Sequence, residues 1–210
     1  LLFLKSINNY ELILVNDGSD DGTLEIMTNA AKLNNQIKII SYPINQGKGW
    51  AVKQGVSVAQ GKLIIFIDAD GSIVPDQIPY MLEKLKDYDI VTGDRSLESS
   101  HVIQPLLRKA TGITFNFYNR ILFNNNIRDN LCGFKGFKHD VAKELFAKLQ
   151  TKGWIFDVEL FYLIKKKGFR FYPLPLVWKH KGQSKMGITD PIKMLFQLIK
   201  LRIKLGKYED

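Results

Sequence analysis

Cysteine, long apolar runs and low-complexity segments are scarce or absent in this chain of 210 residues. Cys132 is the only cysteine, so no disulfide can form within the chain, and a reducing compartment is the simpler expectation. No run of 18 or more apolar residues occurs, so we expect no helix that spans a bilayer. No internal repeat and no linker rich in Gly, Ser or Pro divides the sequence, which suits one domain or one domain with an appended arm.

Acidic residues are scarce in the second half of the chain. Residues 106–210 contain 21 Lys and Arg but 8 Asp and Glu, whereas residues 1–105 contain 9 and 13, giving net charges of +13 and −4. An acidic half joined to a basic half suits a metal-bound nucleotide donor and an anionic acceptor or surface. Nucleic acid is the alternative anionic partner, but no helix-turn-helix, zinc-finger or RNA-recognition signature accompanies the charge, so we expect no nucleic acid.

Strand patterns and helix patterns alternate through the first half. We expect strands at residues 10–16, 37–42, 63–68 and 89–93, and helices at 22–33, 48–59 and 75–85. Asp20 or Asp21 is the expected cap of the first of these helices. Residues 1–6 resemble the end of an earlier helix. The alternation predicts an α/β fold with a mostly parallel sheet and helices on its faces.

Two acids follow an apolar run directly. Asp68 and Asp70 come after Leu-Ile-Ile-Phe-Ile at residues 63–67, which we expect to be a buried strand. Ligands of α/β proteins bind where the strands end, and hard carboxylate oxygens there suit Mg²⁺ or Mn²⁺, completed by substrate phosphates. Ser72 can add a further oxygen. An isolated pair of this kind would more simply be a solvated turn.

Three further segments end at the same predicted edge of the sheet. Asp17 follows the first strand, and its carboxylate can accept hydrogen bonds from a base or ribose. Gly47 and Lys48 open a helix whose N-terminus suits anionic groups. Arg95 follows the fourth strand, and its guanidinium can hold a phosphate with two hydrogen bonds. Four such segments at one edge favour a site over four unrelated turns.

These motifs resemble a known family. The segments V-N-D-G-S-x-D-G-T, N-x-G-K-G-x-A-V, D-A-D-G and G-x-R-S-L, in this order, resemble the family 2 glycosyltransferases of the GT-A (Rossmann-like) fold. Residues 129–137, 153–160 and 178–186 resemble the dolichyl-phosphate β-glucosyltransferase branch. The resemblance implies an inverting transfer of a hexose, most simply glucose from UDP-glucose, to dolichyl or polyprenyl phosphate. A GDP-mannose donor and a saccharide acceptor are the alternatives within the family.

The resemblance also implies roles for single residues. It places Arg95, Arg108 and Lys185 at the acceptor phosphate. Asp157 and Asp129 are expected to contact sugar hydroxyls, although either can instead pair with Lys135 or cap a helix. Altogether we expect catalysis from Asp70, Arg95 and Asp157, metal binding by Asp68 and Asp70, and substrate binding by Asp17, Gly47, Lys48, Asp68, Arg108, Asp129 and Lys185.

Four other residues of the second half are left with open roles. For Glu159, a functional role and a structural role are equally expected. His180 is either a third metal ligand or, more simply, structural, and we leave it outside the metal site. Trp154 and Trp178 are expected in the core rather than stacked on a sugar.

One element of the resembled family is missing. Its opening strand, with a P-x-Y-N-E segment that packs on the nucleotide base, has no counterpart, and the chain starts at Leu1 without a signal-peptide pattern. We therefore expect an N-terminally truncated GT-A domain at residues 1–186. Two other classes remain as alternatives: a nucleotidyltransferase, or a catalytically silent binding module.

The last segment, residues 187–210, has its own pattern. Over residues 191–207, Lys and Gln recur at spacings of three and four beside a broad apolar arc. Such a helix suits an anionic membrane surface, so we expect a peripheral protein on the cytoplasmic face of a membrane, of undetermined oligomeric state. The alternative is a helix packed on the domain or on a partner chain.

Overall fold

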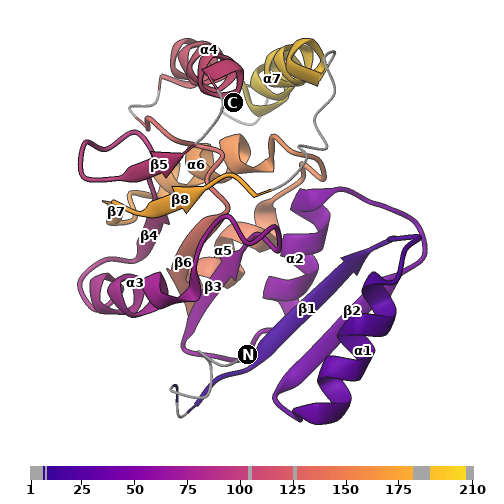
Figure 1. Cartoon of the computed structure of the whole chain (residues 1–210). Helices are drawn as coiled ribbons and strands as arrows, with labels where there is room; N and C mark the ends of the chain where they lie inside the picture. Colours follow the sequence, from indigo (N-terminus) through magenta and orange to yellow (C-terminus); the bar gives the residue numbers. More distant parts are fainter. Residues whose placement is uncertain (1–6, 8, 104–105, 125–126, 182–189, 207–210) are drawn as a thin grey trace.

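The two strands that lead into site motifs, β3 (Leu63–Ile67) and β4 (Ile90–Gly93), run in the same direction on either side of β6 (Phe134–Lys138). Both pair with β6 in antiparallel fashion, and β4 also pairs in parallel with β7 (Phe171–Leu174), so the strand order is β3-β6-β4-β7. The carboxyl ends of β3 and β4 therefore lie at one edge of this sheet, as a common site requires (Figure 1).

The computed structural model describes residues 7, 9–103, 106–124, 127–181 and 190–206, with the backbone alone at 106–111 and 190–194. The remaining elements of these residues are β1 (Leu12–Asp17), α1 (Thr23–Leu33), β2 (Ile37–Tyr42), α2 (Lys48–Val58), the 3₁₀ helix η2 (Pro75–Gln77), α3 (Ile78–Lys84), β5 (His101–Ile103), α4 (Leu106–Phe123), α5 (His139–Lys148), α6 (Phe156–Lys167), β8 (Val177–Lys179) and α7 (Asp190–Gly206).

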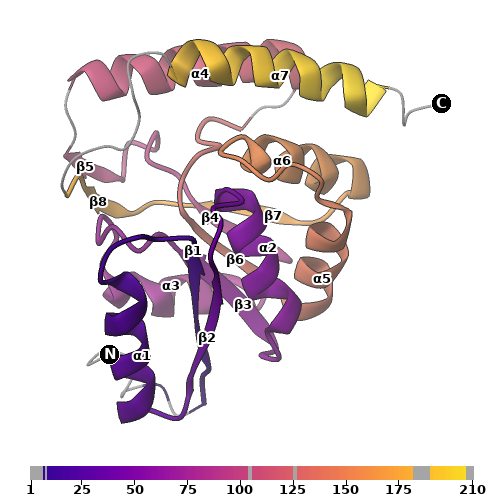
Figure 2. The same cartoon turned by 90° about the vertical axis from the view of Figure 1, so that its right-hand side faces the viewer.

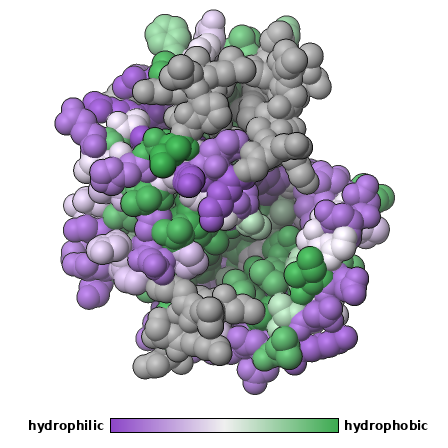
Figure 3. All heavy atoms as spheres, viewed as in Figure 1, coloured by the Kyte–Doolittle hydropathy of each residue, from purple (hydrophilic) through white to green (hydrophobic). Residues whose placement is uncertain are grey.

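Strands β1 and β2 form a separate parallel pair, with Leu12 opposite Ile37. Helix α2 connects this pair to the rest of the molecule, because it packs on β1 and also on α5 and α6. Within the described residues, neither β1 nor β3 has a strand partner on its other edge. A hollow containing apolar side chains lies between β3 and the β1–β2 pair in the space-filling view (Figure 3).

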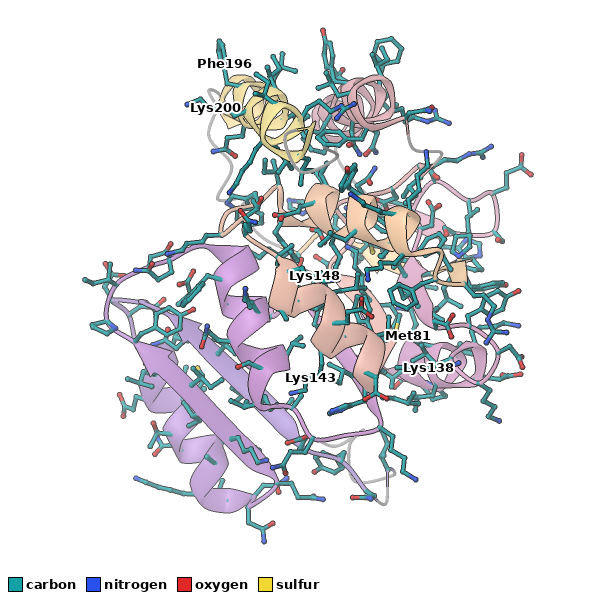
Figure 4. The ribbon with its side chains drawn as sticks, turned by 180° about the vertical axis from the view of Figure 1, so that it is seen from behind. Met81, Lys138, Lys143, Lys148, Phe196 and Lys200 are labelled. Carbon is teal, nitrogen blue, oxygen red and sulfur yellow. The ribbon has the colours of Figure 1, made fainter. Side chains whose placement is uncertain are left out.

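The core lies on both faces of the four-stranded sheet. One apolar cluster joins β3 and β6 to α5 and α6, with Phe137, Leu145 and Phe156 fully buried. A second joins the same sheet to α3, around Met81 and Phe134 (Figure 4). Burying side chains of this size contributes about 1.5–3 kcal/mol each, which fixes the strands whose ends form the site.

The α/β class is confirmed, with several local corrections. Three of the five strand pairings in the described chain are parallel, and the antiparallel ones both involve β6. The expected buried strand at residues 63–67 is present but only partly buried: Leu63 and Ile67 at its two ends are each 37% exposed, and among the described residues β3 pairs on one side only. Residues 1–6 lie outside the described part.

The first residues of α1 and α3 also differ in detail from those that the sequence predicts. Gly22, not Asp20 or Asp21, is the N-cap residue of α1, although the Asp21 carboxylate accepts a hydrogen bond of 2.9 Å from the Thr23 backbone N–H. The segment entered through Pro75 begins as a 3₁₀ turn before α3. Both differences leave the helix N-termini where the sequence pattern places them, within the usual uncertainty of helix ends.

Helices α4 and α7 pack side by side over the end of the molecule that is farthest from α1 (Figures 1 and 2). On α7, Leu198, Leu201 and Leu205 are buried against a cluster that includes Phe123 and Val158. The expected C-terminal helix is therefore present and packs on the domain by one stripe. Among the described helices, none is both long and apolar enough to cross a membrane.

Candidate active site

Lys48 and Asp68 are joined where α2 begins and β3 ends. The Lys48 Nζ lies 2.8 Å from Oδ1 and 2.9 Å from Oδ2 of Asp68, so the ammonium contacts both carboxylate oxygens. Burial lowers the pKa of the Lys48 ammonium, but the negative charges of Asp68 and Asp157 outweigh it, and the pKa is raised. The ammonium also lies 5.3 Å from the Trp154 ring centroid. Lys48 is thus a charged, positioned group.

Gly133 makes room for the Asp68 carboxylate. A Cβ at position 133 would overlap the carboxyl group of Asp68, and the Asp68 backbone N–H donates to the Gly133 carbonyl at 2.9 Å. Any side chain at 133 would displace the carboxylate. Sequence reasoning missed this residue; the glycine before the Phe-Lys-Gly-Phe strand was its only signal.

Asp17 holds the loop that leads into α2. Its Oδ1 accepts from the Gln46 N–H at 2.7 Å and its Oδ2 from the Gly47 N–H at 2.9 Å. Gly47 has φ +101°, a conformation that favours glycine, and a Cβ there would come within 2.6 Å of the Lys152 carbonyl oxygen. Asp17 therefore shapes the backbone that presents Lys48. Its expected contact with a nucleoside stays a prediction.

Asp70 forms the turn that follows β3. It is exposed, and its Oδ1 accepts from the Ser72 backbone N–H at 2.9 Å. The Ser72 side chain is buried, and its Oγ has no hydrogen-bond partner. Gly71 turns the chain at φ +68°, and a Cβ built there would be 3.9 Å from the Lys181 Nζ. The sequence pattern did not single out Lys181, an exposed cation beside this turn.

Arg95 and Asp129 form a bidentate pair. Arg95 Nε donates to Oδ2 and Nη2 to Oδ1, each at 2.8 Å, and the Arg95 backbone N–H donates to Oδ2 at 2.9 Å. Burial raises the pKa of the Asp129 carboxyl, but the charge and hydrogen bonds of Arg95 outweigh it and hold the pKa below its usual range. The guanidinium also lies 5.3 Å from the Trp178 ring centroid. Substrate roles for Arg95 and Asp129 stay predictions.

Lys135 and Asp157 form a buried ion pair. The Lys135 Nζ lies 2.8 Å from the Asp157 Oδ1, with both side chains at most 2% exposed. Burial raises the pKa of the Asp157 carboxyl against the opposing charges of Lys135 and Lys48. The Lys135 ammonium also donates to the backbone carbonyls of Asn130 and Cys132. The pairing with Lys135, which the sequence left open as an alternative, is present; a sugar contact by Asp157 stays a prediction.

Glu159 fixes a loop beside the start of α2. Its two carboxylate oxygens accept from the backbone N–H groups of Gln150 and Thr151 at 3.0 and 2.7 Å. The next residue, Lys152, accepts a hydrogen bond from the Trp50 N–H at 3.0 Å through its carbonyl. Glu159 is buried, so its position here is structural.

The described site residues belong to one electrostatic cluster. Burial opposes both shifts, but Asp68 and Asp157 raise the pKa of Lys48, and Asp129, with a smaller contribution from Asp68, raises that of Arg95. Asp68 is thus close enough to act on both Lys48 and Arg95, and Asp157 on Lys48, whereas their assembly into one substrate site stays a prediction. For Arg108 the backbone alone is described, in α4, and Lys185 lies outside the described residues.

Of the two tryptophans predicted to lie in the core, Trp178 does and Trp154 does not. Trp178 is buried in the core, as expected, and stacks on His180 with 6.0 Å between ring centroids. The core assignment of Trp154 was wrong: its side chain is 52% exposed beside Lys48. The ring thus contacts the Lys48 ammonium, at 5.3 Å from its centroid, rather than the core.

The two acids after β3, Asp68 and Asp70, are the expected ligands of a divalent cation. No group of three or more His, Cys, Asp or Glu side chains that could hold a metal occurs among the described residues. Asp68, whose carboxylate packs against Gly133, and Asp70 each carry hard oxygen atoms, and their role as metal ligands stays a prediction. Such a pair suits Mg²⁺ or Mn²⁺, which take their remaining ligands from phosphates and water.

Comparison with known proteins gives consistent matches. The sequence model of glycosyl transferase family 2 matches residues 2–146. The chain is 36% identical over 202 residues to dolichyl-phosphate beta-glucosyltransferase ALG5C of Trichomonas vaginalis, covering 92% of this chain and 60% of that one. It is 31% identical over 226 residues to the dolichyl-phosphate beta-glucosyltransferase of Saccharomyces cerevisiae, covering 97% and 68%. The chain thus spans about three fifths to two thirds of the length of these two relatives.

Solved structures show the same fold. Glucosyl-3-phosphoglycerate synthase of Mycobacterium tuberculosis, crystallised with Mn²⁺, uridine diphosphate and glucosyl-3-phosphoglycerate, superposes with a TM-score of 0.62 at 18% identity, covering 90% of this chain and 66% of that one. The mannosyltransferase PcManGT of Pyrobaculum calidifontis, crystallised with GDP-Man and Mn²⁺, gives 0.57 at 17% identity, covering 83% and 48%. At these identities the likeness establishes the fold alone.

Proposed function

Because the chain belongs to glycosyl transferase family 2, we propose that it is an inverting glucosyltransferase that moves glucose from UDP-glucose to dolichyl phosphate. The observation that carries the choice of substrates is the 36% identity, over 92% of the chain, to a dolichyl-phosphate beta-glucosyltransferase. Family membership also favours this class over the nucleotidyltransferase that the sequence left open.

The donor half of the proposed site would lie between the end of β3 and the start of α2. Asp68 and Asp70 would hold Mg²⁺ or Mn²⁺, which when bound neutralises charge on the departing nucleoside diphosphate. Lys48, held by the loop that Asp17 and Glu159 fix, offers an ammonium beside the same acids. Asp70 is exposed and its Oδ1 accepts a hydrogen bond from the Ser72 backbone N–H, so its carboxylate is accessible from solvent.

The acceptor half needs cations rather than a base. A phosphate monoester has its second pKa near about 6, so it is largely dianionic at neutral pH and attacks without losing a proton to the protein. Its alignment with the anomeric carbon would be the task of Arg95, Arg108 and Lys185. The net charge of +13 on residues 106–210 supports an anionic acceptor.

A membrane surface is the proposed place of the reaction. Helix α4 exposes Ile113, Phe117 and Ile121 at spacings of four residues, and α7 exposes Phe196, Ile199 and Ile203. Phe196 and Lys200 lie on the outer side of α7, away from the sheet (Figure 4). Apolar stripes on two adjacent helices, with lysines beside them, suit the interface of an anionic bilayer, here its cytoplasmic face.

Transfer of radiolabelled sugar to dolichyl phosphate tests the proposal. UDP-glucose and GDP-mannose would be compared as donors, each with Mn²⁺ and with EDTA, for the parent and for Asp70→Asn. We expect a β-linked glucosyl lipid from UDP-glucose, lost with EDTA and lost in the variant. Transfer from GDP-mannose instead, or equal activity with EDTA, would overturn the donor or the metal assignment. No transfer from either donor would favour a silent binding module.

A further inference from the structure

The Asp68 carboxylate, the first of the two expected metal ligands, is already paired with the ammonium of Lys48. Both of its oxygens lie within 2.9 Å of the Lys48 Nζ. A divalent cation that binds this carboxylate must approach the same oxygens, so the ammonium and the metal compete for one position. On its other side the carboxylate packs against Gly133, where a Cβ would overlap it, so Lys48 and Gly133 hold it between them.

The anchoring of Lys48 makes this contact a built feature rather than a surface ion pair. The side chain is 16% exposed, and its backbone is the first residue of α2. Asp17 fixes the preceding residue Gly47, and Trp154 lies over the ammonium. The loss of Asp68 as a partner would therefore leave the Lys48 ammonium charged and largely desolvated, unless an anion replaced the carboxylate.

We propose that Lys48 is an internal competitor for the metal-binding carboxylate Asp68, so that the site binds a divalent cation weakly until an anionic donor takes over the ammonium. Lys48 then exchanges one anion, the carboxylate, for another, the diphosphate, while Asp68 becomes available as a ligand. Cation and diphosphate binding are coupled, each strengthening the other by the same factor. This inference rests on the proposed function for the nature of the donor.

Binding of Mn²⁺, followed by the electron paramagnetic resonance signal of the free ion, tests the exchange without any turnover. The titration uses the whole chain with and without uridine diphosphate, for the parent, Lys48→Met and Lys48→Arg. We expect Lys48→Met to bind Mn²⁺ alone about tenfold more tightly than the parent, while Lys48→Arg, which keeps a competing cation, does not. We expect uridine diphosphate to strengthen Mn²⁺ binding at least tenfold in the parent and clearly less in Lys48→Met.

Lys152→Met is the matched control for charge. Lys152 lies near the same loop and above the Trp50 ring, and its ammonium donates to Gln46 rather than to Asp68. Its replacement removes the same charge and should leave Mn²⁺ affinity within about twofold of the parent. Equal tightening in Lys152→Met and Lys48→Met, no tightening in Lys48→Met, or an undiminished effect of uridine diphosphate would each overturn the inference.

The two proposals fail separately. If Mn²⁺ binding follows the expected pattern but no glucose reaches dolichyl phosphate, the exchange at Asp68 stands and the proposed function falls. If glucose transfer requires metal but Lys48→Met binds Mn²⁺ like the parent, the function stands and the competition is refuted.

Discussion

Arg95 and Asp129 are locked together by three hydrogen bonds, two from the guanidinium and one from the Arg95 backbone N–H, all between 2.8 and 2.9 Å. Asp129 is only 4% exposed, and Arg95 is its principal counter-charge, with a smaller contribution from Lys135. The pair joins the end of β4 to the segment before β6. Arg95 is therefore a structural residue in addition to any role at an acceptor phosphate.

Replacing Arg95 by Ala should cost about 3 kcal/mol of unfolding free energy, because it leaves the Asp129 carboxylate buried without its principal counter-charge. Urea denaturation followed by circular dichroism measures the loss. The double variant Arg95→Met, Asp129→Leu should recover most of it, since no charge is then stranded. A loss below about 1 kcal/mol in Arg95→Ala would show that water or another cation replaces the guanidinium.

The same pair predicts a pH dependence. The pKa of Asp129 is lower in the folded protein than the value of about 3.9 expected for the unfolded chain. Its contribution to stability is thus fully present above that value and is lost as the pH falls through the folded pKa. Between about pH 5 and pH 2, the unfolding free energy of Asp129→Asn should fall less steeply than that of the parent. Changing the exposed Asp87 to Asn removes the same charge outside this pair and provides the matched control.

The buried pair of Lys135 and Asp157 should respond differently to single and double replacement. Lys135→Met strands a carboxylate that is 1% exposed, and a loss of about 3 kcal/mol or protonation of Asp157 should follow. Lys135→Met with Asp157→Leu should be close to the parent in stability, as measured by the thermal midpoint and by urea. If the double variant folds but transfers no sugar while binding donor normally, Asp157 has the catalytic role that the sequence predicted; full activity would exclude it.

Much of the fold could be predicted because its signals are local. The apolar run before Asp68, the turn residues after Asp17 and the glycines before α2 each specify a strand or a helix start within about ten residues. Family membership, confirmed by the sequence match, also depends on these short motifs. The edge at which the acids gather follows from the shared direction of β3 and β4.

The partners of the charged residues could not be predicted in the same way. Lys48 and Asp68 are 20 residues apart and belong to different layers, so only the packing of α2 brings them together. The insertion of β6 between β3 and β4 is likewise a long-range pairing, and it buries Lys135 beneath the site. Sequence patterns identify which residues are charged, whereas the tertiary contacts decide which of those charges are already neutralised.

The acceptor site can be tested at a residue outside the buried pairs. The resemblance places Arg108 at the acceptor phosphate, and Arg108→Ala should raise the KM for dolichyl phosphate about tenfold while leaving the KM for UDP-glucose nearly unchanged, since one phosphate contact is lost. Lys185→Ala should act in the same direction. Steady-state kinetics in detergent micelles measures both constants. An unchanged acceptor KM in both variants would move the acceptor phosphate elsewhere.

The outer side of α7 should determine membrane binding. Phe196 and Ile203 are 63% and 59% exposed, and burying each in a bilayer would contribute up to about 1.5–3 kcal/mol, while Lys200 and Lys204 add roughly 1 kcal/mol each near anionic lipid. Phe196→Ser with Ile203→Ser should release the protein from anionic liposomes in a sedimentation assay at any salt concentration. Lys200→Glu with Lys204→Glu should release it most clearly at low ionic strength, because salt screens the attraction that remains in the parent.

The control for this experiment changes the net charge by the same amount, but at two lysines that lie outside α4 and α7. Lys32 on α1 and Lys86 after α3 are exposed, and changing both to Glu alters the net charge equally. This variant should sediment with liposomes like the parent, because its lysines do not adjoin the apolar stripe. Both sets of α7 variants should still bind uridine diphosphate, since the buried stripe Leu198, Leu201 and Leu205 is untouched and keeps α7 on the domain. If the α7 variants sediment like the parent, the exposed stripe is not the membrane contact, and α7 serves as a packing helix alone.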